Sequence, residues 1–203
     1  MFAEGRSSLR ASIEEEEQMY HNVIDNLNSY FDTNIERLEN KISNLRKGNP
    51  HEEVNNIISV DEAALDIYRE GLSKCLEMLI VRIHSYVESN LQAMIKQYFS
   101  WSENKIKDGK KVLSQNRKYK FSDLEAYFVI LKQQRNSSLE LRHEWRDFDE
   151  FHNLRNHIVH SKSAEDNISM RLTADYLKKN LDMAAHLLKK IDDQHSVNKF
   201  QHS

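Results

Sequence analysis

The stretch Lys47-Gly48-Asn49-Pro50 separates two long segments with helical periodicity and so decides the fold. Glycine suits the position just after a helix, and proline cannot continue one. Apolar residues recur every three or four positions from about Ser8 to Leu45 and again from about Val60 to Ile106. We predict a long N-terminal helix, a polar connector that reaches about Ser59, and then a central core helix.

The rest of the chain also favours helices. Its 203 residues include 4 glycines and 1 proline, and because turns concentrate these residues, we expect few turns and few, long elements. Further helices are predicted at residues 122–134, 139–160 and 173–193, and Asp149 is expected to split the second of these. The predicted apolar face of the last helix consists of Leu177, Leu181, Ala184, Ala185, Leu188 and Ile191. The fold class is therefore all-α, with residues 1–50 as an N-terminal helical extension and 51–203 as a helical domain.

The central segment is long for a compact domain, since a single helix over its full length would extend ~70 Å. We expect a bend at Gly71 to relieve this. Its predicted apolar stripe consists of Ala64, Ile67, Tyr68, Leu72, Cys75, Leu76, Leu79, Ile83, Val87, Leu91, Met94, Ile95 and Tyr98.

Charge and cysteine content narrow the class of protein. The net charge of −3 lacks the basic excess of a DNA-coating protein but leaves room for a local RNA-binding cleft. Cys75 is the only cysteine, which excludes an intramolecular disulfide and a cysteine-based zinc cluster. The first residues lack the apolar run of a signal peptide, and no apolar stretch approaches the ~20 residues of a membrane span. We expect a cytoplasmic protein with no membrane partner.

A basic, polar stretch from Lys105 to Lys120 is predicted to be a loop. Its cations can attract a phosphate backbone, and a merely solvated loop is the alternative. The residues that we single out for RNA contact are Lys110, Lys111, Arg117 and Lys118.

The segment from Phe151 to Ser161 is the one that looks suited to chemistry, because it places an arginine, an asparagine and several histidines among apolar anchors. On a helix, Asn156 and His160 are four residues apart and share a face, and the long side chain of Arg155 can reach that face. Leu154 and Ile158 are also four apart and can anchor the segment in the core.

These residue types suit phosphodiester cleavage without a metal. Arginine holds phosphate through paired donors, and histidine can move a proton near neutral pH. Asparagine can orient the histidine or bind the substrate. The alternative is structural: Arg155 pairs with a carboxylate and the histidines cap a helix end. A metal site at His152, His157 and His160 is not expected, because the segment lacks the glutamate of a His-Glu-x-x-His zinc helix. We expect no cofactor.

The residues from Arg155 to His160 resemble the Arg-x4-His motif of the HEPN (higher eukaryote and prokaryote nucleotide-binding) superfamily, in which a polar residue, often asparagine, follows the arginine. The motif ends one helix and a further amphipathic helix follows it, as in that superfamily. Upstream, the segment from Tyr86 to Leu91 resembles the aromatic-x-Glu segment of several bacterial HEPN groups. The resemblance covers roughly residues 60 to 193 and implies a HEPN-like, homodimeric helical bundle.

In activity, the resemblance implies a metal-independent endoribonuclease whose site forms where two protomers meet. An RNA 2′-hydroxyl attacks the adjacent phosphate and leaves a 2′,3′-cyclic phosphate and a 5′-hydroxyl. Arg155 would stabilise phosphate charge, His160 would transfer the proton, and Asn156 and Glu88 would support them. Such proteins serve as toxins of toxin–antitoxin pairs or as antiviral effectors, so a cognate antitoxin or regulatory protein is a predicted partner. The alternative is a catalytically silent HEPN-like module that binds a protein through its N-terminal helix.

Overall fold

The computed structural model describes residues 8–48, 51–114, 126–127, 129–131, 142–160 and 172–196, without the side chains of residues 114, 142–149, 160 and 194–196. The part so described is helical and contains no strand, which confirms the all-α class. Its main elements are α1 (Ser8–Lys47), α2 (Glu52–Phe99), α3 (Glu103–Ser114), α5 (Arg142–His160) and α6 (Ala174–Ser196).

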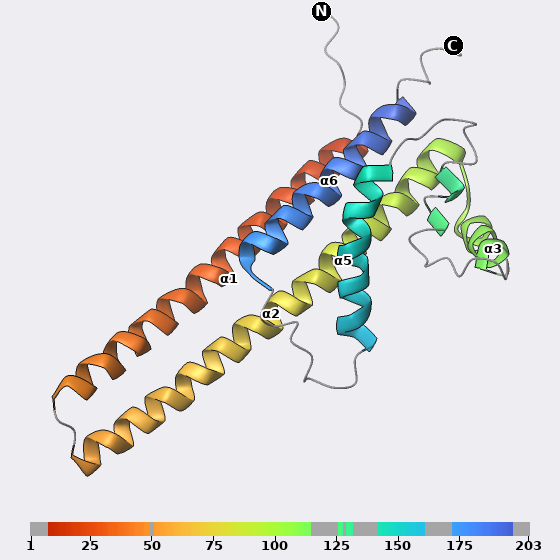
Figure 1. Ribbon diagram of the computed structural model, residues 1–203. Helices are drawn as coiled ribbons and strands as arrows, with labels where there is room; N and C mark the ends of the chain where they lie inside the picture. The colour runs from red at the N-terminus through yellow and green to blue at the C-terminus, as the bar shows by residue number, and fades with distance from the viewer. Residues whose placement is uncertain are drawn as a thin grey trace, which may run out of the picture.

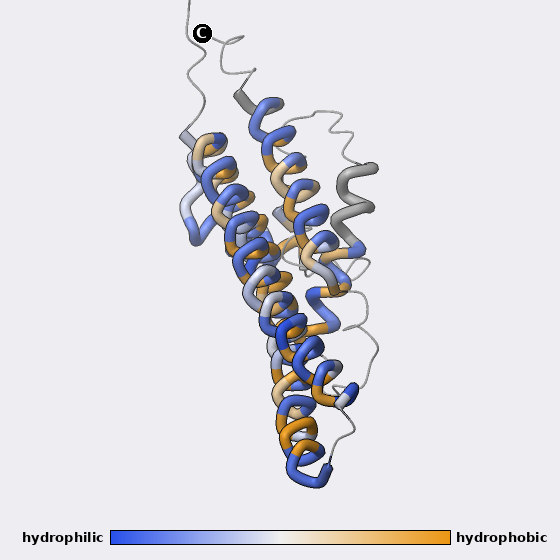
Figure 2. The backbone as a smooth tube through the Cα atoms, turned by 90° about the vertical axis from the view of Figure 1, so that its left-hand side faces the viewer, coloured by the Kyte–Doolittle hydropathy of each residue, from blue (hydrophilic) through white to orange (hydrophobic). Residues whose placement is uncertain are grey.

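α1 and α2 form a long antiparallel hairpin, and the other helices pack around one half of it (Figure 1). α6 lies antiparallel to α1 along the N-terminal half of that helix, and α5 packs against α2 and α6. The main core lies where these helices meet, and hydrophobic and hydrophilic positions alternate along their turns (Figure 2). Fully buried residues of this core include Ile13 and Ile24 of α1, Ile80, Ile83 and Leu91 of α2, and Leu181 and Leu188 of α6.

The other half of the hairpin projects as a two-helix arm (Figure 1), which we define as residues 35–47 and 52–68. It has its own small core, made of Leu38, Ile42, Ile58 and Leu65. Apolar residues from Phe31 through Leu45 have a heptad-like spacing, and in the structure they contact α2 of the same chain. The predicted connector to Ser59 is wrong, because α2 begins at Glu52. Burial of Ile58 against α1 stabilises a helix that its polar neighbours alone do not indicate.

The domain division at residue 50 stays a prediction, but the first helix is not separate from the core. Leu9, Ile13 and Ile24 of α1 belong to the same buried cluster as residues of α2 and α6. Tyr86 of α2 also donates a hydrogen bond to the backbone carbonyl of Ile13 at 3.2 Å. We infer that the half of α1 nearer its N-terminus is a structural part of the bundle.

The central helix differs from its prediction at its C-terminal end, and the bend predicted at Gly71 stays a prediction. α2 is one continuous helix through Gly71. Phe31 lies so close that a Cβ built on this glycine would be 3.0 Å from its ring. Glycine at 71 therefore permits a close approach of α1. The helix ends at Phe99 and not at Ile106, because Ser100 adopts the left-handed conformation.

The predicted basic loop is wrong over its first part, since residues 103–114 form α3. The remainder, 115–120, lies outside the described residues, as does the start of the helix predicted at 122. Within that prediction, residues 126–127 and 129–131 are helical. Tyr127 is buried in the main core, so this short segment belongs to the bundle.

The last two helices carry the candidate site. α5 is continuous from Arg142, so the predicted split at Asp149 is wrong. α6 begins directly after Thr173, whose hydroxyl accepts a hydrogen bond from the backbone N–H of Tyr176 at 3.1 Å, as expected for an N-cap. The predicted apolar face of α6 is confirmed, because every member is fully buried: Leu177, Leu181, Ala184, Ala185, Leu188 and Ile191. None of the described helices has both the length and the apolar character needed to cross a membrane.

Candidate functional site

The C-terminal half of α5 presents an apolar side and a polar side. Phe151 is fully buried in the main core, and Leu154 and Ile158 pack against that core from partly buried positions. These residues recur at steps of three and four, so they lie on one face of the helix. They fix α5 and thereby determine where His152, Arg155 and Asn156 lie.

A pair of buried histidines joins α5 to α2. Nε2 of His84 lies 2.8 Å from Nδ1 of His152, and the two rings stack with their centroids 5.0 Å apart. Only 5% of His84 and 7% of His152 is exposed. A buried imidazole needs hydrogen-bond partners, and here each ring supplies one for the other.

The histidine pair is hydrogen-bonded to residues of the predicted Arg-x4-His motif. Asn156 contacts Nε2 of His152 through its Nδ2 atom at 2.9 Å, and Arg155 donates from Nη1 to Oδ1 of Asn156 at 2.9 Å. His84, His152, Asn156 and Arg155 therefore form one connected group, which we call the α2–α5 polar cluster. It spans two helices that are far apart in the sequence.

The hydrogen bonds of this cluster have a defined direction. Arginine can only donate, so the oxygen of the Asn156 amide must face Arg155 and its NH₂ must face His152. Nε2 of His152 is then an acceptor, which places the His152 proton on Nδ1. That proton is donated to Nε2 of His84. The guanidinium thus fixes the amide orientation, and the amide fixes the histidine tautomers.

The imidazole of His84 is held neutral by its surroundings. The pKa of His84 is lowered from its ordinary 6.5 to about 4, chiefly because burial disfavours the charged ring and further because His152 and Arg155 lie nearby. If His84 were also protonated on Nε2, its N–H would point at the N–H of His152 Nδ1, which is unfavourable. The permanent positive charge of the cluster therefore resides on Arg155.

Arg155 is half-buried, and one of its donors has no partner in the part of the chain that the structure describes. Its Nε atom is buried and finds no acceptor among the described residues. An unmatched buried N–H costs roughly 1–3 kcal/mol, more when the group is charged.

The other predicted site residues are only partly described. The backbone of His160 lies in the last turn of α5, one turn beyond Asn156 on the same face, but its side chain is outside the described part. Glu88 is half-buried on α2 and makes no ion pair with any described residue, so it is not the partner of Arg155. Its supporting role stays a prediction.

Two of the predicted RNA-contact residues lie on α3. Lys110 donates to the hydroxyl of Tyr127 at 3.1 Å and lies over that ring, 4.7 Å from its centroid. Lys111 is exposed in the last turn of α3. Arg117 and Lys118 lie outside the described residues. Contact of these residues with RNA stays a prediction, and Lys110 would have to leave Tyr127 to make it.

Neither His84 nor the structural role of His152 was predicted from the sequence. One signal was available: His84 follows Ile83 and lies within the apolar band of α2, and a polar residue on a buried face requires a partner. The partner of His84 is His152, 68 positions further along the chain. The two meet only because α5 packs against α2, and no local sequence pattern reveals that packing.

Comparison of the chain with family models, with curated proteins and with solved structures finds no match. The HEPN resemblance therefore rests on the motif and on the order of the helices.

Proposed function

We propose that the chain is a metal-independent endoribonuclease of HEPN type, with Arg155 as the phosphate-binding cation and His160 as the proton-transfer residue. The observation that carries this proposal is the contact of Arg155 with Asn156, which ties the arginine of the motif into the α2–α5 polar cluster. Such a cluster can hold a guanidinium in one orientation before substrate arrives, which electrostatic stabilisation of a transition state requires.

Arg155 is half-buried, so part of its side chain reaches the surface, which supports a role in anion binding. A guanidinium that uses Nη1 on Asn156 still has other N–H groups for phosphate oxygens. The ordinary alternative, pairing of Arg155 with a protein carboxylate, finds no support, because no ion pair of Arg155 occurs among the described residues.

In this proposal, His84 and His152 are positioning residues. Both are buried, and the pKa of His84 is lowered to about 4, so they are unsuited to donating a proton to substrate. Their part is to hold the Asn156 amide, which in turn orients Arg155. Proton transfer is left to His160, one helical turn further along α5.

We further propose that the active form is a homodimer in which two α5 helices meet. Val159, within the motif, is apolar and 45% exposed, and an exposed apolar residue beside a charged site suits an interface. Two copies of Arg155 and His160 would then face one scissile phosphate. A toxin or antiviral effector, with a cognate antitoxin or regulator as partner, is the proposed biological setting.

The test is RNA cleavage by the purified chain in excess EDTA, with Arg155→Ala, His160→Ala and the matched control His157→Ala. We expect His157→Ala to cleave like the wild type, because His157 is an exposed histidine of the same helix outside the proposed machinery. Loss of the proton-transfer group or of the phosphate-binding cation should each slow cleavage by about 10²–10³-fold or more. Equal activity in all variants would overturn the assignment.

A second candidate is a silent module that binds a protein partner through α1. It is favoured by Met19, Val23 and Tyr30, which are exposed and spaced four and seven residues apart on one face of that helix. If purified protein leaves RNA intact, and expression of the wild type is as harmless as that of Arg155→Ala and His160→Ala, this candidate replaces the first.

A further inference from the structure

A ladder of ion pairs runs along the seam between α1 and α6, away from the α2–α5 polar cluster. From pair to pair, the residue number rises along α1 and falls along α6, because the two helices are antiparallel. The pairs are Arg10 with Asp193, Glu17 with Lys189, His21 with Asp182, and Asp25 with Lys178.

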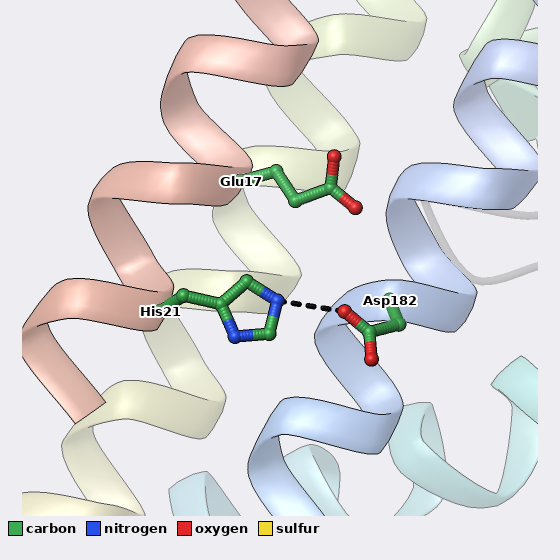
Figure 3. A group of neighbouring side chains, drawn as sticks. All are labelled: Glu17, His21 and Asp182. Atoms are coloured by element: carbon green, nitrogen blue, oxygen red, sulfur yellow. Dashed lines mark hydrogen bonds and ion pairs between the residues drawn. The ribbon is translucent and has the colours of Figure 1, made fainter. Parts of the chain in front are cut away.

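One pair of the ladder differs from the rest in its chemistry. In the others the cation is an arginine or a lysine, which are not ordinary metal ligands, whereas Asp182 is paired with the imidazole of His21. Glu17 lies one helical turn from His21 on α1 and directs its carboxylate toward the same space (Figure 3). Glu17, His21 and Asp182 thus bring one nitrogen and two carboxylate ligands together, a set that suits a divalent metal.

The geometry of this trio is close to what a zinc ion requires. One ligand atom from each residue lies within 4.8 Å of the others, and Nε2 of His21 is already 2.7 Å from Oδ1 of Asp182. In a tetrahedral site with bonds of ~2.0–2.2 Å, ligand atoms are about 3.4 Å apart. The ligand atom of Glu17 has to approach by at most about 1.4 Å, the difference between 4.8 Å and that spacing, which rotation of the side chain allows.

The surroundings supply a further feature of metal sites. Lys189 of α6 binds one oxygen of the Glu17 carboxylate and leaves the other for a ligand bond. Carboxylate ligands are commonly held by such outer hydrogen bonds, which fix their orientation. The imidazole ligand favours zinc and similar first-row metals over Mg²⁺ or Ca²⁺, which prefer all-oxygen sites.

We infer that Glu17, His21 and Asp182 form a binding site for a zinc-type divalent cation that fastens α1 to α6. In this site the metal replaces the proton shared by His21 and Asp182, and three protein ligands leave a position for water. Its role is to stabilise the bundle. The site is independent of the proposed RNA cleavage, which needs no metal.

The experiment is titration of Zn²⁺ into the full-length, chelator-stripped chain by calorimetry. We expect one Zn²⁺ per chain, bound at least about tenfold more weakly after Asp182→Asn, Glu17→Gln or His21→Gln. The matched control is His51→Gln, because His51 is an exposed histidine at the far end of the hairpin, and it should bind as the wild type does. Asp182 is 60% exposed, so its variant keeps the fold, which circular dichroism verifies.

A second readout is thermal unfolding with and without Zn²⁺. Saturating Zn²⁺ should raise the Tm of the wild type and of His51→Gln by about 3 °C or more, and should leave Asp182→Asn unchanged. If the ligand variants bind Zn²⁺ as tightly as the wild type, the ion is held by scattered histidines and the site is overturned. If the wild type binds none, the trio is only a rung of the ion-pair ladder and the inference is equally wrong.

Discussion

Nε2 of His84 lies 2.8 Å from Nδ1 of His152, and this contact between two buried rings links the central helix to the helix that carries the motif. Through Asn156 the same pair reaches Arg155. The cluster therefore couples the packing of α5 on α2 to the orientation of the arginine.

The first prediction concerns stability against pH. The pKa of His84 is 6.5 in its ordinary state and about 4 in the folded chain, so below about pH 6.5 the unfolded chain takes up a proton that the folded chain does not. The free energy of unfolding should therefore fall as the pH drops from about 6.5 to 4, by up to about 3 kcal/mol from this residue. His84→Gln, which can still accept from His152, should lack this component. Urea unfolding at several pH values from 7.5 to 4.5 measures the free energy of unfolding of the wild type and of His84→Gln. The same dependence on pH in the two proteins would contradict the prediction.

A second prediction concerns the amide of Asn156. In Asn156→Asp the carboxylate still accepts from Arg155 but cannot donate to His152, so His152 must carry its proton on Nε2. We expect RNA cleavage to fall by about 100-fold, because Arg155 becomes locked in an ion pair. Imidazole ¹⁵N chemical shifts should report the changed tautomer of His152.

The matched control for that prediction is Asn153→Asp, which adds the same charge to the same helix at an exposed position. It should preserve both cleavage and tautomer. An equal loss of activity in the two variants, or an unchanged tautomer in Asn156→Asp, would exclude the positioning role.

The sequence predicts the fold best where apolar periodicity is strong. The face of α6 is predicted residue by residue, because six small or aliphatic positions at helical spacing leave no alternative. The start of α2 is missed, because residues 51–56 are polar except for Val54, and it is the packing of Val54 and Ile58 against α1 that stabilises this part of the helix. Ile67 is placed wrongly in the apolar stripe and is 70% exposed, since none of the other described helices covers the arm.

Only those contacts of the candidate site that join neighbours in the sequence can be predicted from it. Arg155 and Asn156 are adjacent, so their contact follows from the helix. The contact of His152 with His84, and that of His21 with Asp182, join helices far apart in the sequence and depend on tertiary docking. The sequence shows that these residues can bond, but it does not show which of the chain's 10 histidines will meet.

A third prediction uses two isoleucines of one helix. Ile80 of α2 is fully buried in the main core, whereas Ile67 lies on the arm with most of its surface exposed. Ile80→Ala should lower the free energy of unfolding by about 2–5 kcal/mol, through lost burial and the cavity it leaves. Ile67→Ala should change it by less than about 0.5 kcal/mol. Chemical denaturation compares them, and comparable losses would show that the arm is buried in solution.

A fourth prediction concerns the approach of α1 to Gly71. Alanine favours a helix interior over glycine by roughly 1 kcal/mol, but a Cβ at 71 would lie 3.0 Å from the ring of Phe31. Gly71→Ala should therefore stabilise the chain by about 1 kcal/mol in a Phe31→Leu background and by clearly less alone. A double-mutant cycle measures this coupling. Strict additivity would mean that the two helices do not meet closely here.

The central claim, that Arg155 and His160 cleave RNA without a metal, is tested most directly by the ends of the RNA fragments produced in excess EDTA. Attack by the 2′-hydroxyl predicts fragments that end in 2′,3′-cyclic phosphate and begin with 5′-hydroxyl, formed by the wild type and not by His160→Ala. RNA that stays intact, cleavage that EDTA abolishes, or fragments with 3′-hydroxyl and 5′-phosphate ends would contradict the claim.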